Sequence, residues 1–228
     1  MNETNINAQS PKTRHSKWTF LSNATFQFPA TMINSVLAGF LLFYYEVVIG
    51  LNVWLIVLAL SIFTVYHALN SPIIGFLVDR NIRFTRKWGR RFPWIIVGII
   101  PWTLSVFFIF SVPEIDASAN PWPVVGWLIL TLFLFGTFST LVTINVGALR
   151  PDKFRTEEER QIFAKYYTPI DILAIIIGML LPALFIDIIP GDKKASYQIM
   201  GGMIAIVSFF LAFLTEWVFI YCICAYPF

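Results

Sequence analysis

Residues 70–98 read NSPIIGFLVDRNIRFTRKWGRRFPWIIVG and carry the clearest structural signal in the chain. An apolar segment ends at Val78, an acidic-basic pair follows at Asp79 and Arg80, and a loop rich in Arg and Lys leads into a second apolar segment at Phe92. Two apolar segments joined by a strongly basic loop are typical of membrane-spanning helices connected on the cytoplasmic side. The stretch therefore predicts a helical membrane protein.

The composition of the whole chain agrees with that class. Its 228 residues are 57% hydrophobic and 13% charged, whereas a soluble domain is about 25% charged. The mean hydropathy is +0.72. The basic residues lie in loops and form no nucleic-acid face, and no P-loop, hydrolase or zinc-ligand motif occurs. We therefore predict an all-α membrane protein that is not an enzyme, carries no cofactor or metal, and has the lipid bilayer as its main partner.

Six transmembrane helices are expected within a membrane domain at 25–221, because each segment has about the 20 apolar residues that cross the hydrocarbon core. The expected spans are 26–48, 54–78, 92–112, 122–146, 166–189 and 197–221. Residues 1–24 are polar and predict a disordered cytoplasmic tail, and residues 222–228 predict a C-terminal tail. Thr156 and Glu159 have capping-box spacing, which predicts a short amphipathic helix leading into the fifth span.

Lys and Arg predict the orientation. Of the 16 basic residues, all but Lys193 and Lys194 lie in the N-terminal tail or in the loops after the second and fourth spans. Because Lys and Arg are enriched in cytoplasmic loops, both termini are expected in the cytoplasm, and the protein in the plasma membrane.

The basic loop after the second span has two interpretations. Asp79 can pair with a neighbouring arginine and hold one conformation closed, which predicts a cytoplasmic gate. Alternatively, the cations anchor the loop to anionic lipid. The expected gate residues are Gly75, Asp79, Arg80, Arg90 and Arg91.

Polar residues inside the spans are candidates for a substrate or ion pathway, because such residues usually face a bundle interior or a wet cavity. The candidates are Asn34, His67, Asn70, Ser71, Thr143, Thr168 and Asp171. An imidazole titrates near neutral pH, so His67 either binds a coupling proton or contacts an anionic substrate. The alternative is a neutral His67 hydrogen-bonded to a hydroxyl of the first or fourth span. Asp171 lies either in the cavity or near the cytoplasmic surface, and threonines repeating in the fourth span suit helix packing.

Several short motifs resemble one family of transporters. They are Asn70-Ser71-Pro72 with Gly75, Trp88-Gly89-Arg90-Arg91-Phe92-Pro93-Trp94, the aromatic end of the first span at 43–48, and Ala148-Leu149-Arg150-Pro151. Together they resemble the N-terminal half of glycoside–pentoside–hexuronide:cation symporters, the melibiose-permease-like branch of the major facilitator superfamily. The resemblance implies a six-helix bundle of two three-helix repeats and ion-coupled alternating-access transport of a small solute, with sugars or glycosides as the first expectation and H⁺ or Na⁺ as the coupling ion.

The acidic and basic residues of that family's binding sites are absent here. Under the resemblance, the two cation-binding acids of the second span fall at His67 and Ser71. The first-span acid falls at Thr31, the fourth-span acid at Thr143 and the fifth-span arginine at Thr168. The sodium–melibiose chemistry of the family is therefore not expected to carry over.

A superfamily transporter needs two six-helix halves with the substrate between them. This chain supplies one, so we expect a homodimer or a separate second six-helix half, unless the gene is truncated or frame-shifted near Glu216. The alternative function is that of a non-transporting six-helix membrane protein, either an assembly partner or an inactive fragment.

Overall fold

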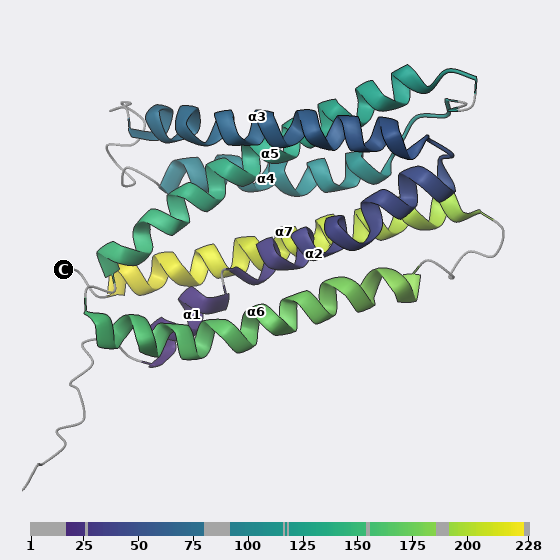
Figure 1. The fold of residues 1–228 in the computed structure, drawn as a ribbon. Coiled ribbons are helices and arrows are strands. Elements are labelled where there is room, and N and C mark those ends of the chain that lie inside the picture. The colour runs from purple at the N-terminus through teal and green to yellow at the C-terminus, as the bar shows by residue number, and fades with distance from the viewer. Residues whose placement is uncertain are drawn as a thin grey trace, which may run out of the picture.

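The computed structural model describes residues 17–25, 27–79, 92–115, 117, 119–153, 156–185 and 192–225. Figure 1 shows the helices that these residues form, coloured in their order along the chain. The helices are α1 (Lys17–Thr25), α2 (Gln27–Phe43), the π-helix η1 (Tyr44–Val48), α3 (Val53–Asp79), α4 (Phe92–Phe110), α5 (Pro121–Lys153), α6 (Glu157–Phe185) and α7 (Lys193–Ala225).

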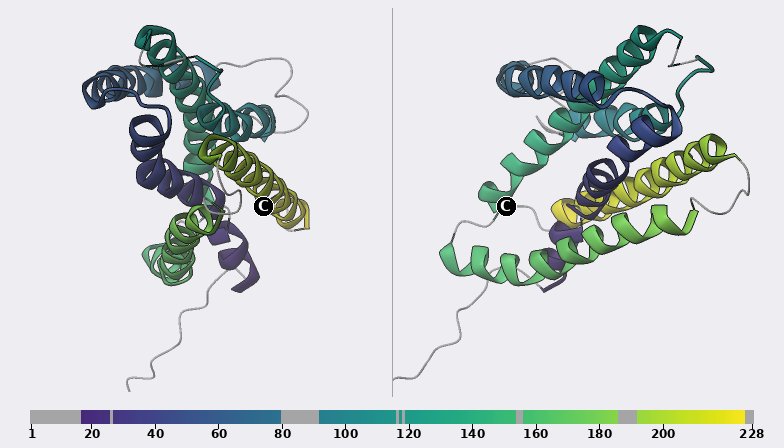
Figure 2. Two further views of the ribbon diagram at one scale, coloured as in Figure 1. Left: turned by 90° about the vertical axis from the view of Figure 1, so that its right-hand side faces the viewer. Right: turned by 45° about the vertical axis from the view of Figure 1, so that its right-hand side comes forward.

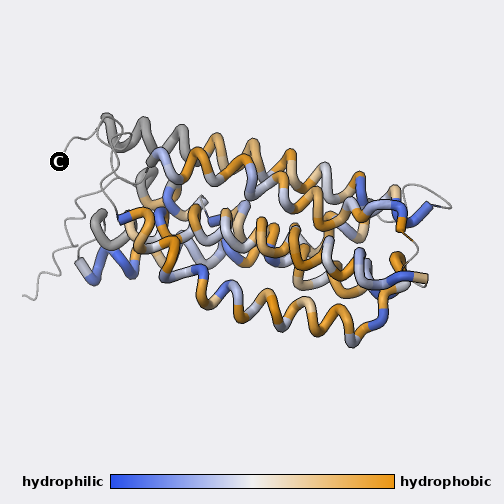
Figure 3. The backbone as a smooth tube through the Cα atoms, turned by 90° about the horizontal axis from the view of Figure 1, so that it is seen from above, coloured by the Kyte–Doolittle hydropathy of each residue, from blue (hydrophilic) through white to orange (hydrophobic). Residues whose placement is uncertain are grey.

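The predicted six spans are confirmed as six helices long and apolar enough to cross a membrane. The first consists of the end of α1 together with α2 and η1, over Asn23–Val48, and the other five are α3 to α7. Figure 3 shows hydrophobic residues along most of each helix and hydrophilic ones gathered towards the ends of the bundle, which is the distribution that a bilayer requires.

Some boundaries differ from the predicted ones. Helix α1 begins at Lys17, within the range predicted as a tail, because Phe20 and Ala24 are buried against the rest of the bundle. Helix α7 continues to Ala225 instead of ending at 221.

The helix predicted before the fifth span is confirmed at its start but is not separate. The Glu159 N–H donates to Thr156 Oγ1 at 3.3 Å, and the Thr156 N–H donates to Glu159 Oε2 at 3.5 Å, so the capping box is formed. The helix then runs unbroken to Phe185. A cap fixes where a helix begins, and no residue between the cap and the apolar segment ends it.

Most of the helices run in nearly the same direction, and α5 crosses them obliquely (Figures 1 and 2). Helices α4 and α7 pack against each other, α4 also packs against α5, and α7 also packs against α2. Helix α3 packs mainly against α5, while α6 packs mainly against α2 and α1. Together, α3 and α6 are the least buried of the six spans, so they form two flanks of the bundle.

At the end of the bundle where η1 leads into α3, three side chains satisfy the last turn of α4. The final carbonyls of a helix have no partner within it and need donors from elsewhere. The three bonds join Tyr44 Oη to the Phe110 carbonyl (2.7 Å), Tyr45 Oη to that of Ile109 (2.8 Å) and Trp127 Nε1 to that of Phe108 (3.1 Å). They tie the first and fourth spans to the end of the third.

The π-helix η1 brings both tyrosines to this position. Its i→i+5 bond runs from the Ile49 N–H to the Tyr44 carbonyl at 3.0 Å. Gly50 follows with a φ of 77°, a backbone conformation that favours glycine, and allows the sharp turn into α3.

Candidate functional site

The α3–α5 pair forms a polar seam, which we define as Tyr66, His67 and Asn70 of α3 with Gly136, Thr137 and Thr140 of α5. Three side-chain hydrogen bonds cross it. They join Tyr66 Oη to Thr137 Oγ1 (2.6 Å), His67 Nε2 to Thr140 Oγ1 (3.3 Å) and Asn70 Nδ2 to the Gly136 carbonyl (3.4 Å). The bond to Thr140 matches the alternative in which His67 bonds to a hydroxyl of the fourth span.

Ring packing and a glycine complete this seam. The Tyr66 ring stacks on Phe133 with centroids 3.9 Å apart. At Gly136, a Cβ would lie 2.7 Å from the Phe63 ring, so glycine is needed for this close approach. Small residues at such crossings allow membrane helices to pack closely, and the polar groups then bond across the interface.

Among the described residues, the contact between α2 and α6 has fewer side-chain hydrogen bonds than the α3–α5 seam. Thr31 Oγ1 donates to Asp171 Oδ1 at 2.5 Å. Two turns further along α6, a Cβ at Gly178 would lie 2.7 Å from the Met32 carbonyl oxygen and 3.0 Å from Ser35 Cβ. Here the glycine faces backbone, and one side-chain bond links the ionisable group to the neighbouring helix.

Thr31 and Thr140 differ from other hydroxyl residues of the spans. Many of those donate to the carbonyl four residues earlier in their own helix. This group includes Ser35, Ser61, Thr64, Ser71, Thr143 and Thr168. Thr31 and Thr140 instead bond to an ionisable side chain on a neighbouring helix.

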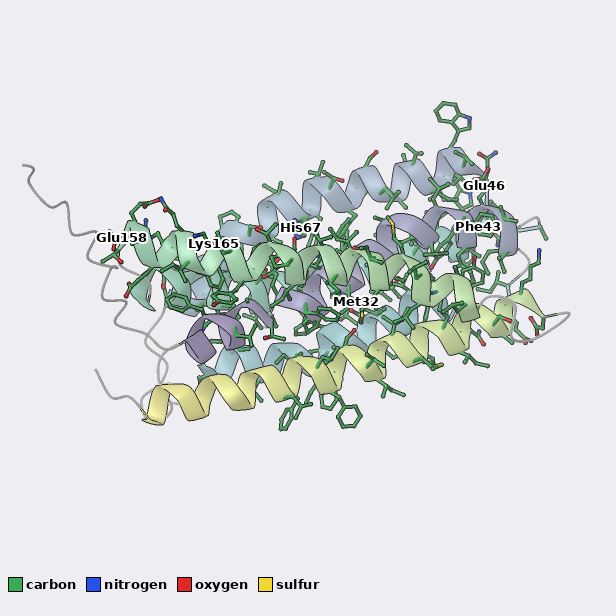
Figure 4. The ribbon with its side chains drawn as sticks, turned by 90° about the horizontal axis from the view of Figure 1, so that it is seen from below. Met32, Phe43, Glu46, His67, Glu158 and Lys165 are labelled. Carbon is green, nitrogen blue, oxygen red and sulfur yellow. The ribbon has the colours of Figure 1, made fainter. Side chains whose placement is uncertain are left out.

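The ionisable pairs lie in the middle part of the bundle. Figure 4 places His67 and Met32, the neighbour of Thr31, between Glu158 and Lys165 towards one end and Phe43 and Glu46 at the other. A group at this depth is far from both ends of the spans, which is where a transported solute or ion meets the protein in alternating access.

The structure brings together only part of the predicted pathway. His67, Asn70 and Asp171 have partners on other helices. Asn34, Thr143 and Thr168 are exposed, and so is His67 despite its bond to Thr140. Ser71 is half-buried and donates to the His67 carbonyl of its own helix.

The predicted site did not include Thr31, Tyr66 or Thr137 as bonding groups. Thr31 had one signal, because the family resemblance places an acid at its position. Tyr66 stands directly before His67, but the sequence does not show which face of the helix it occupies.

The gate residues are only partly described. Asp79 is exposed at the last residue of α3. A Cβ at Gly75 would have no neighbour within 4 Å, so this glycine makes no close helix crossing in this conformation. Arg80, Arg90 and Arg91 lie outside the described residues, so their pairing with Asp79 stays a prediction.

Among the described residues, no group of three or more His, Cys, Asp or Glu side chains is arranged to hold a metal ion. The ionisable groups of the middle of the bundle are instead paired one by one with hydroxyls.

A bundle of six apolar helices with paired ionisable groups near its middle is the architecture of a multi-pass membrane protein. The sequence pattern of the family described as MFS/sugar transport protein matches residues 22–221. The chain therefore belongs to this family, which confirms the resemblance to major facilitator symporters.

Several proteins named as symporters are similar to parts of this chain. An uncharacterized symporter of Synechocystis is 29% identical over 182 residues, which are 79% of this chain and 33% of that protein. The sodium-dependent lysophosphatidylcholine symporter 1-A of Danio rerio is 31% identical over 113 residues, 50% of this chain and 20% of that protein. The uncharacterized symporter YnaJ of Bacillus subtilis is 26% identical over 195 residues, 81% of this chain and 39% of that protein. The chain thus spans less than half the length of these curated relatives.

Proposed function

We propose that this chain forms half of a secondary active transporter that moves a small solute by ion-coupled alternating access. The observation that carries the proposal is that two ionisable side chains, His67 and Asp171, lie midway along the bundle. Each of them is bonded to a threonine of a neighbouring helix. Ionisable groups at this depth are costly and usually serve an ion or substrate path. Membership of a family of symporters agrees with this role.

The packing supports a repeat of two three-helix units, α2 to α4 and α5 to α7. In this repeat, α2 corresponds to α5, α3 to α6 and α4 to α7. When corresponding helices are exchanged, the α2–α6 contact becomes the α5–α3 contact, the α4–α5 contact becomes the α7–α2 contact, and the α4–α7 contact stays the same. All of these contacts are present. Such internal repeats are common in transporters, where substrate sites form at the interface between repeats.

The exposed polar residues of the spans favour a partner that covers them. Asn34, Thr143 and Thr168 would face lipid in an isolated six-helix unit, which is unfavourable. We infer that they line the path with His67, Asn70, Ser71 and Asp171, and that a second six-helix half or a second copy covers them.

The cytoplasmic gate and the orientation belong to the same proposal. With both termini in the cytoplasm of a cell bounded by the plasma membrane, Asp79 lies at the cytoplasmic end of α3. It then pairs with Arg80, Arg90 or Arg91 when the path is closed on that side, and Gly75 leaves room for α3 to shift.

Two substrate classes follow from the resemblances. Sugars or glycosides are favoured by the family description. The names of the Danio relatives add lysophosphatidylcholine, an amphipathic lipid. Both classes are small solutes that a path between two six-helix halves accommodates.

The test is uptake by proteoliposomes that contain the full-length protein. Labelled melibiose and labelled lysophosphatidylcholine are offered separately, under a sodium gradient, under a pH gradient and without either. Gradient-stimulated accumulation of one substrate supports the proposal and names the class and the ion. Binding of either substrate without accumulation under any gradient would favour the non-transporting alternative.

A further inference from the structure

Asp171 is an acidic residue within the apolar part of α6. Between residues 166 and 185 the sequence contains no other acidic or basic residue. The side chain is half-buried, and its Oδ1 accepts the 2.5 Å hydrogen bond from Thr31 Oγ1. A carboxyl group at such a position needs both a partner and a reason to remain there.

Its hydroxyl partner suits a group that gains and loses a proton. An ionised carboxylate only accepts hydrogen bonds, while the neutral acid also donates one, and a hydroxyl does both. Thr31 can therefore donate to the carboxylate of Asp171 or accept from the acid. The hydrogen bond between the two side chains can therefore exist in either protonation state of Asp171.

The described contact offers too few oxygens for a divalent cation. Hard cations such as Ca²⁺ and Mg²⁺ take about six or more oxygen ligands. The described contact offers the Asp171 carboxyl and the Thr31 hydroxyl, and the Thr31 carbonyl already accepts a bond from Ser35 Oγ at 2.8 Å.

No cation on α2 holds Asp171 permanently ionised, because α2 contains no ionisable residue at all. Helices α1, α2 and α7 pack against α6. The ionisable residue of α1 is Lys17, and on the neighbouring turns of α6 itself they are Lys165, Tyr166 and Tyr167. Those of α7 lie towards its ends and are Lys193, Lys194, Tyr197, Glu216, Tyr221, Cys222 and Cys224. Among the described residues, the partner of the Asp171 carboxyl is the Thr31 hydroxyl rather than a cation.

We propose that Asp171, held by Thr31, is the proton-binding group that couples transport to a pH gradient. The carboxylate takes one proton from water, becomes the neutral acid with an O–H bond on its carboxyl, and later returns that proton to water on the other side. This inference rests on the proposed transport function for its consequence, but proton binding itself is measurable without transport.

The first experiment is an infrared pH titration of the full-length protein in lipid vesicles, followed at the carbonyl stretch of protonated carboxylic acids. We expect one titrating band that disappears in Asp171→Asn, whose amide still accepts from Thr31, and that persists in the control Glu46→Gln. Persistence of every titrating band in Asp171→Asn overturns the proposal.

The partner is tested by varying Thr31. Thr31→Val removes the hydroxyl, and because a hydrogen bond to a charged carboxylate is stronger than one to a neutral acid, the midpoint of the band should shift from its wild-type position. Thr31→Ser should keep the wild-type midpoint. Thr64→Val is the matched control, because the Thr64 hydroxyl donates to its own helix at Leu60. An unchanged midpoint in Thr31→Val, with the variant folded by circular dichroism, contradicts the assignment of the pair.

Transport assays then separate the two proposals. Solute uptake that a pH gradient does not stimulate, in wild type and Asp171→Asn alike, removes proton coupling and leaves the transport function standing. A titrating Asp171 in a protein that accumulates no solute removes the transport function and leaves the proton site.

Discussion

The α3–α5 pair and the α2–α6 pair each hold an ionisable side chain midway along the bundle, but with different amounts of support. Three side-chain hydrogen bonds and a ring stack link α3 to α5 in the seam, and one of these bonds, to Thr140, is made by His67. Asp171 has one described bond, to Thr31, near a glycine that lies against backbone. Because Tyr66 and Asn70 also bond across the seam, the polar contact between α3 and α5 does not depend on the charge of His67, whereas the described side-chain bond between α2 and α6 is made by Asp171 itself. The comparison therefore assigns packing to the first pair and switching to the second.

The largest effect is expected where Gly178 is replaced, and Gly136 gives the comparison. At Gly178 a Cβ meets the Met32 carbonyl, which is backbone, so Gly178→Ala should lower the free energy of unfolding by about 2–3 kcal/mol. At Gly136 the obstacle is the Phe63 ring, which can rotate, so Gly136→Ala should cost about 1 kcal/mol. Denaturation in detergent, followed by tryptophan fluorescence, measures both.

Gly147→Ala is the control for these replacements, because a Cβ there has no neighbour within 4 Å. It should leave stability unchanged or slightly raised, since alanine favours a helix over glycine. Equal losses at Gly178 and Gly136 would remove the distinction between a backbone and a side-chain crossing.

A substitution outside the α3–α5 and α2–α6 pairs measures how much unfolding free energy a single buried hydrogen bond contributes. Tyr45→Phe leaves the Ile109 carbonyl without its donor in a buried place, and the expected loss is about 1–2 kcal/mol of unfolding free energy. The same denaturation assay applies, with the half-buried Tyr166→Phe as control. A loss no greater than that of the control would show that water or another donor replaces Tyr45.

The network of the α3–α5 seam is tested by a double-mutant cycle of Tyr66→Phe and Thr137→Val. The expected coupling is about 0.6 kcal/mol, a usual value for hydrogen bonds between membrane helices. Tyr66→Phe combined with Thr64→Val should show none, because the Thr64 hydroxyl bonds within its own helix. Zero coupling in the first cycle would mean that the rings, not the hydroxyls, hold the seam.

The smallest effect is expected for His67→Gln. Glutamine is uncharged and retains a polar end that can bond to Thr140, so the pH profile of solute uptake should keep its shape. Asp171→Asn should flatten that profile under the same conditions. A profile flattened by His67→Gln instead would place the coupling proton in the α3–α5 seam and reverse the comparison.

The sequence predicted the spans well because hydropathy is a property of each segment alone. The start of α6 was also readable, since Thr156 and Glu159 lie three residues apart and the capping box is local. The length of α6 before the membrane was not, because a cap says nothing about where a helix passes from water into lipid. Helix α1 was missed for a similar reason, since its stability comes from burial of Phe20 and Ala24 in the folded bundle.

From the sequence, the hydrogen-bond partners within the candidate site were harder to predict than the residues that belong to it. His67 and Asp171 stood out because ionisable residues are rare in apolar segments. Thr31 did not, because its partner lies 140 residues away and most hydroxyls in these helices bond to their own backbone. Only the folded arrangement shows which threonine leaves that local bond for a neighbouring helix.

The π-helix at Tyr44–Val48 determines how the chain responds to changes in its length. In an α-helix each residue turns the chain by about 100°, while a π-turn holds one extra residue before the backbone bond closes. That extra residue lets two consecutive tyrosines reach two consecutive carbonyls of α4. Deleting a single residue here would restore an α-helical turn and rotate one tyrosine away from its carbonyl. Insertions and deletions at 44–48 are therefore expected to be tolerated less well than in the exposed turn at Asn52, although neither segment contributes to the proton site.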